Sequence, residues 1–387
     1  MKVAASMSRL GTETAFEVLV RAKELESQGK EVIHLEIGEP DFDTPANIRS
    51  AAKAALDEGY THYGPSAGLP LLRQAIAEEI TRTRRVDVNP GQVVVTPGGK
   101  PIIFFSLLAT VDPGDEVIYP NPGFPIYESV INWMGAKPVP LPIREANDFS
   151  VDVNELASLI TPKTTFMILN SPANPTGGLI NEDQMSQIAN LVNEHNITVL
   201  VDEIYSRIIY DGQHVSLLSF PGMQEHVILL DGFSKTYAMT GWRAGYGVMP
   251  EETAFWVSRL MTNSNSCTNS FVQMACVEAL KGPQKDSQAM IMEFQRRRDV
   301  IVNGLNTIEG ISCLNPMGAF YVFPNVQALP KSSKELEEYF LEEYSVASLA
   351  GTSFGSYGEG YLRFSYANSV ENIRKALDRI AEGVAKL

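Results

Sequence analysis

The feature that most constrains the fold is a repeated alternation of short apolar runs with helical segments through the middle of the chain. The apolar runs lie at 92–96, 116–119, 165–169, 198–201 and 227–230. Apolar runs of roughly four to eight residues between turn signals are typical of strands buried on both faces. Strands that alternate with helices form mostly parallel sheets covered by helices on both faces. The sequence therefore predicts a large α/β domain of this kind. Helices are expected at 46–58, at 69–82, from residue 101, and at 125–134.

The two chain ends follow a different pattern. Residues 14–28 predict one helix, and the polar stretch 284–305 predicts a long helix that is followed by mixed elements. Because neither end continues the alternation, we expect the two ends to form a smaller α+β domain together. The predicted limits are 46–283 for the large domain, and 1–45 with 284–387 for the small one.

Charge and cysteine usage exclude several classes of partner. The formal net charge is −15, and so acidic a surface repels nucleic acid and anionic membranes. No run approaches the roughly 20 apolar residues of a membrane span, and the N-terminus lacks the apolar core of a secretory signal. Cys267, Cys276 and Cys313 are widely spaced, without a Cys-x-x-Cys pair. We interpret them as reduced core thiols of a cytoplasmic protein.

The run GFSKTYAMTGWRAG at 232–245 contains a lysine among small residues and, eight positions later, an arginine. The Lys235 amine can form a Schiff base with an aldehyde. The Arg243 guanidinium can hold a phosphate through two parallel hydrogen bonds. This pairing predicts pyridoxal 5'-phosphate (PLP) chemistry, although a solvated surface lysine is the ordinary interpretation of any single lysine.

A second phosphate site is predicted where a strand at 93–95 runs into Thr96-Pro97-Gly98-Gly99-Lys100-Pro101. Two glycines allow the backbone to approach an anion, and the first N–H groups of a helix favour negative charge. Pro101 suits the first helical position. The same residues also fit an ordinary β–α turn.

A P-loop ATPase is a rival interpretation, because such proteins combine a glycine–lysine phosphate motif with an acidic magnesium motif after another strand. Here Gly-Gly-Lys follows one apolar run, and Asp202 and Glu203 follow the apolar run 198–201. The phosphate motif of such proteins requires G-x-x-x-x-G-K-[ST]. Here Val94 stands in the place of the first glycine, and Pro101 in the place of the hydroxyl that binds magnesium. Because that glycine and that hydroxyl are both missing, the loop cannot cradle a nucleotide, and the ATPase interpretation is excluded.

Further polar residues lie at or near strand ends. Asp202 ends an apolar run, where α/β sheets place ligands, and its carboxylate can keep a pyridine nitrogen protonated. Tyr205 can donate to the phenolic oxygen of the same ring. Asn174, in an Asn-Pro-Thr-Gly turn, is a second candidate for that oxygen. Arg363, on an alternating stretch, can hold a substrate carboxylate with both arms. The competing interpretations are a capping aspartate, plain turn chemistry and a solvated strand face.

Taken in order, these motifs resemble those of the class I aminotransferases, in the aspartate aminotransferase superfamily of PLP fold type I. The resemblance covers nearly the whole chain, and the stretch from Ser234 to Arg243 is its most specific part. It implies that Lys235 carries the cofactor and acts as general base, that Asp202 pairs with the pyridine nitrogen, and that Tyr205 supports catalysis. The remaining cofactor contacts that it implies are Asn174 and Tyr205 on the ring hydroxyl, Gly99, Lys100, Ser234 and Arg243 on the phosphate, and Phe124 stacked on the ring.

The resemblance also implies a substrate site and an assembly. Arg363, helped by the backbone of Gly38, is expected to bind the substrate carboxylate, with Phe124 and Asn174 beside it. Tyr63 is similar to the family tyrosine that reaches the phosphate of the neighbouring subunit. The expected partners are therefore an amino acid, a 2-oxo acid and a second copy of the chain in a homodimer.

The expected activity is ping-pong transfer of an amino group from an L-amino acid to a 2-oxo acid. A PLP-dependent lyase that catalyses β-elimination is an alternative on the same scaffold, and a non-catalytic PLP-binding regulator is an alternative from another class. A requirement for a 2-oxo acid separates transfer from elimination. The intact lysine and the acidic charge argue against the regulator.

The preferred substrate is less constrained. Residues 260–267 carry no basic residue for a second carboxylate, whereas Phe124 and an apolar N-terminal segment suit aromatic or aliphatic side chains. We expect an aspartate or a broad-range, aromatic-tolerant enzyme. No pair of histidines has the spacing of metal ligands, so no metal is expected.

Overall fold

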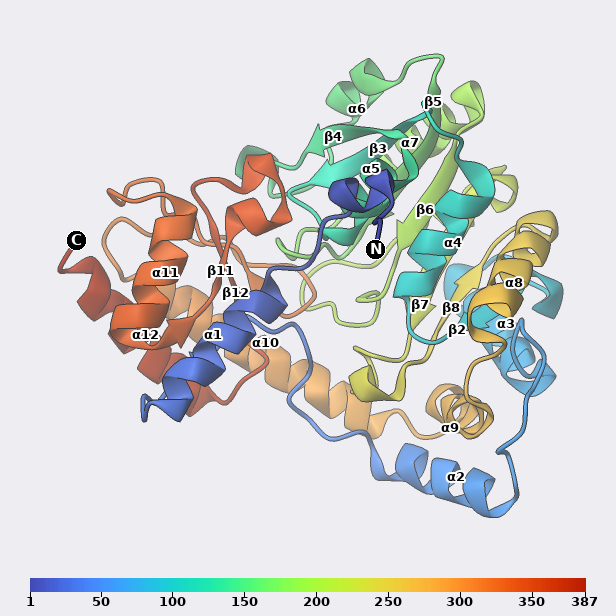
Figure 1. Ribbon diagram of the computed structural model, residues 1–387, viewed down its shortest axis with the longest axis horizontal. Coiled ribbons are helices and arrows are strands. Elements are labelled where there is room, and N and C mark those ends of the chain that lie inside the picture. The colour runs from blue at the N-terminus through green and yellow to red at the C-terminus, as the bar shows by residue number, and fades with distance from the viewer.

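The computed structural model describes residues 1–387, and its centre is a seven-stranded sheet with the strand order β2-β8-β7-β6-β5-β3-β4 (Figure 1). Strands β3 to β7 run parallel, and β8 runs antiparallel to both of its neighbours. The predicted α/β class with a mostly parallel sheet is confirmed. The strands are β2 (Val93–Thr96), β3 (Glu116–Asn121), β4 (Lys137–Pro142), β5 (Thr164–Asn170), β6 (Thr198–Asp202), β7 (Val227–Gly232) and β8 (Gly245–Val248).

Helices cover both faces of this sheet, which explains why its strands are apolar throughout. Successive β6 residues point to opposite faces: Val199 and Val201 join one core cluster, and Leu200 joins another. The Leu200 face is covered by α4 (Lys100–Thr110), α5 (Ile126–Met134) and α8 (Glu251–Asn265). The opposite face is covered by α3 (Pro70–Arg84), α6 (Val153–Leu159), α7 (Glu182–His195) and α9 (Ser270–Lys281), with α2 (Ala46–Asp57) packed on α9.

Two strands of the sheet are absent from the sequence prediction, for identifiable reasons. Strand β4 carries proline at every second position, Pro138, Pro140 and Pro142. Proline cannot donate a ladder hydrogen bond, so it is confined to sheet edges, and β4 is an edge strand. Strand β8 alternates glycine with larger residues, and this hides its apolar character. Both segments therefore look like loops in the sequence.

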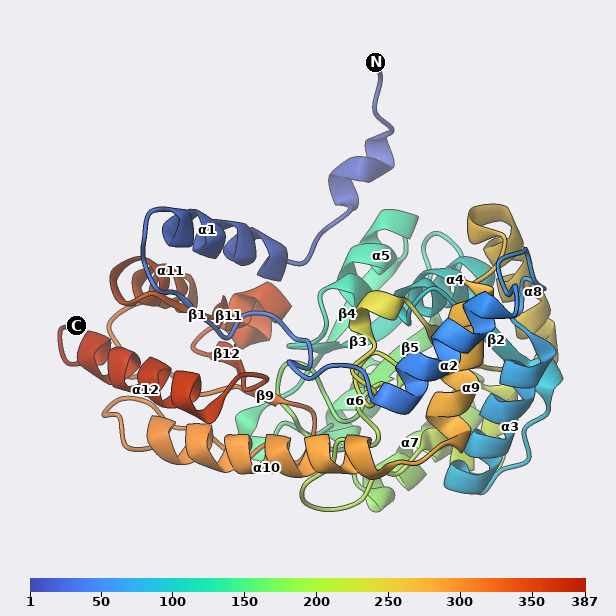
Figure 2. The same cartoon turned by 90° about the horizontal axis from the view of Figure 1, so that it is seen from below.

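The two chain ends come together beside the large sheet (Figure 2). Strand β1 (Ile33–His34) pairs in parallel with β10 (Val346–Ala347). A second small sheet has the antiparallel order β11-β12-β9. Its strands are β9 (Tyr321–Val322), β11 (Leu349–Ala350) and β12 (Leu362–Ser365), and the helices gathered around it are α1 (Ala15–Ser27), α10 (Lys285–Leu305), α11 (Ser333–Tyr344) and α12 (Val370–Val384).

The residues before α1 take a path of their own toward the large sheet (Figure 2). The short 3-10 helix η1 (Ala5–Arg9) packs against α5, and Arg9 Nε donates to the carbonyl of Asn132 at 2.9 Å. Ser129 Oγ donates to the carbonyl of Gly11 at 3.1 Å. The chain therefore crosses from the large part to the small part just before α1. The domain limits given above stay a prediction.

None of the helices is both long enough and apolar enough to cross a membrane.

Candidate active site

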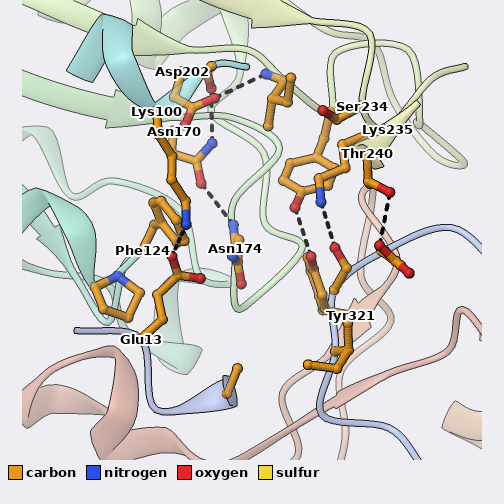
Figure 3. Close-up of a pocket in the computed structure, with 18 of the residues that line it drawn as sticks. Glu13, Lys100, Phe124, Asn170, Asn174, Asp202, Ser234, Lys235, Thr240 and Tyr321 are labelled. Carbon is orange, nitrogen blue, oxygen red and sulfur yellow. Dashed lines mark hydrogen bonds and ion pairs between the residues drawn. The ribbon is translucent and has the colours of Figure 1, made fainter. Parts of the chain in front are cut away.

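A cavity of about 660 Å³ lies where the carboxyl ends of the parallel strands face the small sheet and the segment before α1. Its walls contain every residue that the sequence analysis singled out for the site except Tyr63. Figure 3 shows the central side chains, which come from strand ends, β–α turns and the N-terminal segment. Crevices at the carboxyl ends of strands are where α/β sheets bind their ligands.

Lys235 follows β7 and projects into this cavity (Figure 3). Its Nζ donates to the carbonyl of Gly38 at 2.5 Å. Loss of solvation, assisted by the nearby Arg363 cation, lowers the pKa of Lys235 to about 8. An amine with this pKa is neutral, and therefore nucleophilic, in a much larger fraction near neutral pH than a surface lysine.

Asp202 is the last residue of β6, on the same wall. Tyr127 donates to its Oδ2 at 2.7 Å, and the Ile204 amide donates to its Oδ1 at 3.1 Å. Burial raises the pKa of Asp202 to about 6, and the two donors oppose this shift. A buried carboxylate of this kind is suited to a cationic N–H group. Tyr127 was missed by the sequence analysis, although a polar phenol in the apolar helix α5, three positions after Phe124, is a detectable signal.

Asn170, Asn174 and Arg363 form a chain of hydrogen bonds across the floor. Asn170 Nδ2 donates to the backbone carbonyl of Asp202 at 2.9 Å, and Asn170 Oδ1 accepts from the backbone N–H of Asn174 at 2.8 Å. Arg363 Nη1 donates to Asn174 Oδ1 at 3.2 Å, and Nη2 donates to the carbonyl of Glu36. Arg363 is 4% exposed, so it does not lie on a solvated face.

Arg363 keeps one donor without a partner. Its Nε is buried and makes no hydrogen bond in the protein. Burial lowers the pKa of this guanidinium, and its carbon lies 4.5 Å from the ring centre of Tyr321 and 4.8 Å from that of Phe354. A buried cation with an unused donor is costly unless an anion completes it. The site therefore fits a carboxylate.

The predicted phosphate turn lies against Arg243. Gly98 has φ +91°, and a Cβ there would lie 2.3 Å from Arg243 Nη2. A Cβ on Gly245 would lie 2.6 Å from the Gly99 amide nitrogen. Glycine is thus required for the guanidinium and the turn to approach each other. Helix α4 begins at Lys100, so its N-terminal amides and Arg243 line the same cavity, and both favour an anion.

The opposite wall comes from the chain ends. Tyr321 of β9 belongs to this wall. Its hydroxyl shares a hydrogen bond at 2.8 Å with the hydroxyl of Tyr205, which follows β6 of the large sheet. A Cβ on Gly38 would lie 2.1 Å from the Tyr321 hydroxyl, so only glycine fits there. Tyr321 was missed by the sequence analysis, because nothing in the local sequence indicates which wall its strand faces.

Two of the predicted residues lie differently from the rest. The Lys100 side chain does not extend along the turn; it donates to Glu13 of the N-terminal segment (Figure 3). Only its backbone amide stays with the turn. Tyr63 lies outside the cavity and is 89% exposed. Within one chain it contacts nothing in the site.

Comparisons with known proteins agree on one family. The profile of the family described as aminotransferase class I and II matches residues 30–380. An aspartate aminotransferase of Pyrococcus abyssi is 41% identical over 355 residues, which is 91% of each chain. The aromatic-amino-acid aminotransferase 2 of Thermococcus litoralis is 39% identical over 92% of each chain. The solved aspartate aminotransferase of Rhizobium meliloti superposes with a TM-score of 0.96 at 35% identity, over the full length of both chains.

Proposed function

The chain belongs to the class I and II aminotransferase family and is an aminotransferase, and we propose that it works with PLP carried on Lys235. The observation that carries this proposal is that the Lys235 amine, whose pKa burial lowers to about 8, lines the same cavity as the Asp202 carboxylate and the Arg363 guanidinium.

The residues present fit this cofactor. The glycine turn at Gly98 and Gly99, the first amides of α4, Ser234 and Arg243 would hold the phosphate. Asp202 would face the pyridine nitrogen. Asn174 and Tyr205 would reach the ring hydroxyl, and Phe124 would stack on the ring. Because Lys100 is engaged by Glu13, we assign it to the phosphate through its backbone amide alone.

PLP, when bound, supplies an aldehyde that condenses with amines and a ring that withdraws electrons from the substrate carbon. The protein supplies proton transfer and position. Lys235, neutral in a large fraction near pH 8, would take the proton from the substrate Cα and hold it for delivery to the carbon that the cofactor aldehyde supplies. Asp202, oriented by Tyr127 and the Ile204 amide, would hold a proton on the ring nitrogen of the bound cofactor. The Arg363 donors fix the substrate carboxylate and so orient the Cα–H bond toward Lys235.

We propose that the substrates are L-aspartate and aromatic amino acids, with a 2-oxo acid as acceptor. The activities named for the relatives from Pyrococcus abyssi and Thermococcus litoralis, aspartate and aromatic-amino-acid transfer, support this pair. The cavity supports it as well, because it is lined by the aromatic rings of Phe16 and Phe124 and by the basic Lys100.

We also propose a cytoplasmic homodimer. Tyr63 is a large side chain that is 89% exposed and makes no use of its phenol within one chain. In the homodimer that the family resemblance implies, a second copy would cover this side chain. Its predicted contact is the phosphate of the neighbouring site.

The proposed function is tested with purified protein and PLP. L-aspartate and L-phenylalanine are offered as donors, with 2-oxoglutarate, pyruvate or phenylpyruvate as acceptors. We expect amino transfer that requires an acceptor and parallel lines in double-reciprocal plots, as a ping-pong mechanism demands. Keto-acid formation beyond one equivalent per active site in the absence of an acceptor would contradict the proposal, as would inactivity toward every pair.

A further inference from the structure

One ion pair in the cavity wall has no part in the proposed handling of the cofactor. Glu13 and Lys100 are joined across the cavity mouth, from the N-terminal segment to the start of α4 (Figure 3). The Lys100 side chain is 44% exposed and the Glu13 side chain 17% exposed. Lys100 Nζ also lies 5.6 Å from the ring centre of Phe124 and 6.0 Å from that of Phe16. The pair therefore lies among the rings that line the mouth of the cavity.

Lys100 is the one basic residue of this cavity to which no group of the cofactor or substrate has been assigned. Four basic residues line it, and three have a group to serve: Lys235 the aldehyde, Arg243 the phosphate and Arg363 the substrate carboxylate. Lys100 is instead neutralised by a carboxylate of its own chain. A free cation in the same cavity as Arg363 would be offered to a second carboxylate on the substrate.

The segment that brings Glu13 here is held in place by other contacts. Arg9 donates to the carbonyls of Asn132 and Trp133 at 2.9 and 3.1 Å, and Gly11 accepts from Ser129. Glu13 is thus placed over the cavity without help from Lys100. The adjacent Thr14 lines the cavity too, and its buried Oγ1 makes no hydrogen bond in the protein. An unpartnered hydroxyl next to Glu13 indicates that this segment faces a polar ligand group.

We propose that Glu13 determines substrate specificity as an internal substitute for the distal carboxylate of a dicarboxylic substrate. When the substrate side chain is uncharged, Glu13 keeps Lys100 neutralised, so no unpaired cation faces an aromatic ring. When the side chain is acidic, its carboxylate displaces Glu13 from Lys100. One cavity then accepts both classes, and each acidic substrate binds more weakly by the strength of the pair that it breaks. This inference rests on the proposed function for its choice of ligands.

Binding of two unreactive acids to the PLP-loaded enzyme tests the proposal without turnover. Succinate carries the second carboxylate, and 3-phenylpropanoate carries a ring in its place. Glu13→Gln should tighten succinate binding by roughly 2- to 5-fold, the range of a partly exposed ion pair, and leave 3-phenylpropanoate within about twofold. Glu13→Ala should give the same preference. Glu17→Gln is the matched control, because it removes an exposed carboxylate of the adjoining helix α1 that lies outside the cavity.

A double-mutant cycle separates this role from a general loosening of the segment. In a Lys100→Met background, Glu13→Gln should no longer tighten succinate binding, because there is no cation left to release. The proposal is overturned if Glu13→Gln leaves succinate binding unchanged, tightens both acids equally, or still tightens succinate binding without Lys100. Turnover of aspartate and phenylalanine by the unaltered enzyme tests the proposed function separately, since the binding assays do not depend on it.

Discussion

The two walls of the cavity are built in different ways. The wall that holds Lys235 and Asp202 comes from strand ends and turns of the large sheet, where backbone geometry fixes each side chain. The facing wall comes from the N-terminal segment and the small sheet, and it is joined to the first by side-chain contacts such as Glu13 with Lys100 and Arg363 with Asn174. The first wall, which we call the chemical wall, is suited to reactions that need side chains at fixed positions. The second is suited to selecting substrates, because its contacts can exchange with those of a ligand.

The largest effect is expected from a substitution in the chemical wall, at Asp202. Asp202→Asn keeps the shape and removes the charge that, in the proposed function, holds a proton on the ring nitrogen of PLP. We expect kcat to fall by on the order of 10²- to 10⁴-fold in the aspartate half-reaction, while PLP still binds covalently. Stopped-flow absorbance measures both. A variant with nearly unchanged kcat would remove Asp202 from the chemistry.

The facing wall should respond differently, and Arg363→Lys tests this. Lysine keeps the charge but cannot bind a carboxylate with two parallel hydrogen bonds. We expect kcat/KM to fall by roughly 10- to 100-fold for both aspartate and phenylalanine, mainly through KM. Arg296→Lys is the control, since that arginine is 61% exposed on α10 and pairs only with Glu293. Equal effects of the two substitutions would show that Arg363 does not contact substrate.

The smallest effect is expected at Tyr127, which supports the chemical wall from behind. Tyr127→Phe removes a hydrogen bond that favours the ionised carboxylate, so the pKa of Asp202 should rise further above its ordinary value. The ionised form is then lost at a higher pH as the solution is acidified. We expect a deficit in kcat/KM of about 3- to 10-fold at pH 6 that narrows by pH 8. A deficit that is the same at both pH values would contradict this account.

The same division explains what could be predicted from the sequence. The residues of the chemical wall lie in short contiguous stretches of the chain, such as Gly98 to Pro101 and Ser234 to Arg243. Each stretch follows an apolar run. The pattern that predicts the parallel sheet therefore also predicts that these stretches share one edge of it. The roles assigned to the individual side chains stay predictions, although their meeting in one cavity is what the topology requires.

The facing wall could not be predicted in the same way. Glu13 meets Lys100 across 87 positions of the chain, and Arg363 meets Glu36 across 327. No local pattern encodes such contacts, because they depend on how the two ends pack against the sheet. Residues 260–267, where the sequence analysis expected a second cation, carry none, while the structure places Lys100 in the cavity. Strands β4 and β8 were missed because proline and glycine mask them.

The central claim is a covalent bond between position 235 and the aldehyde of PLP. The most direct measurement is to incubate the protein with PLP, reduce it with borohydride, digest it and map the modified peptide by mass spectrometry. The account predicts a single phosphopyridoxyl group on Lys235, absent from Lys235→Ala and retained in Lys100→Met. A label on any other lysine, or an unlabelled protein under conditions where aminotransferase activity is present, would contradict it.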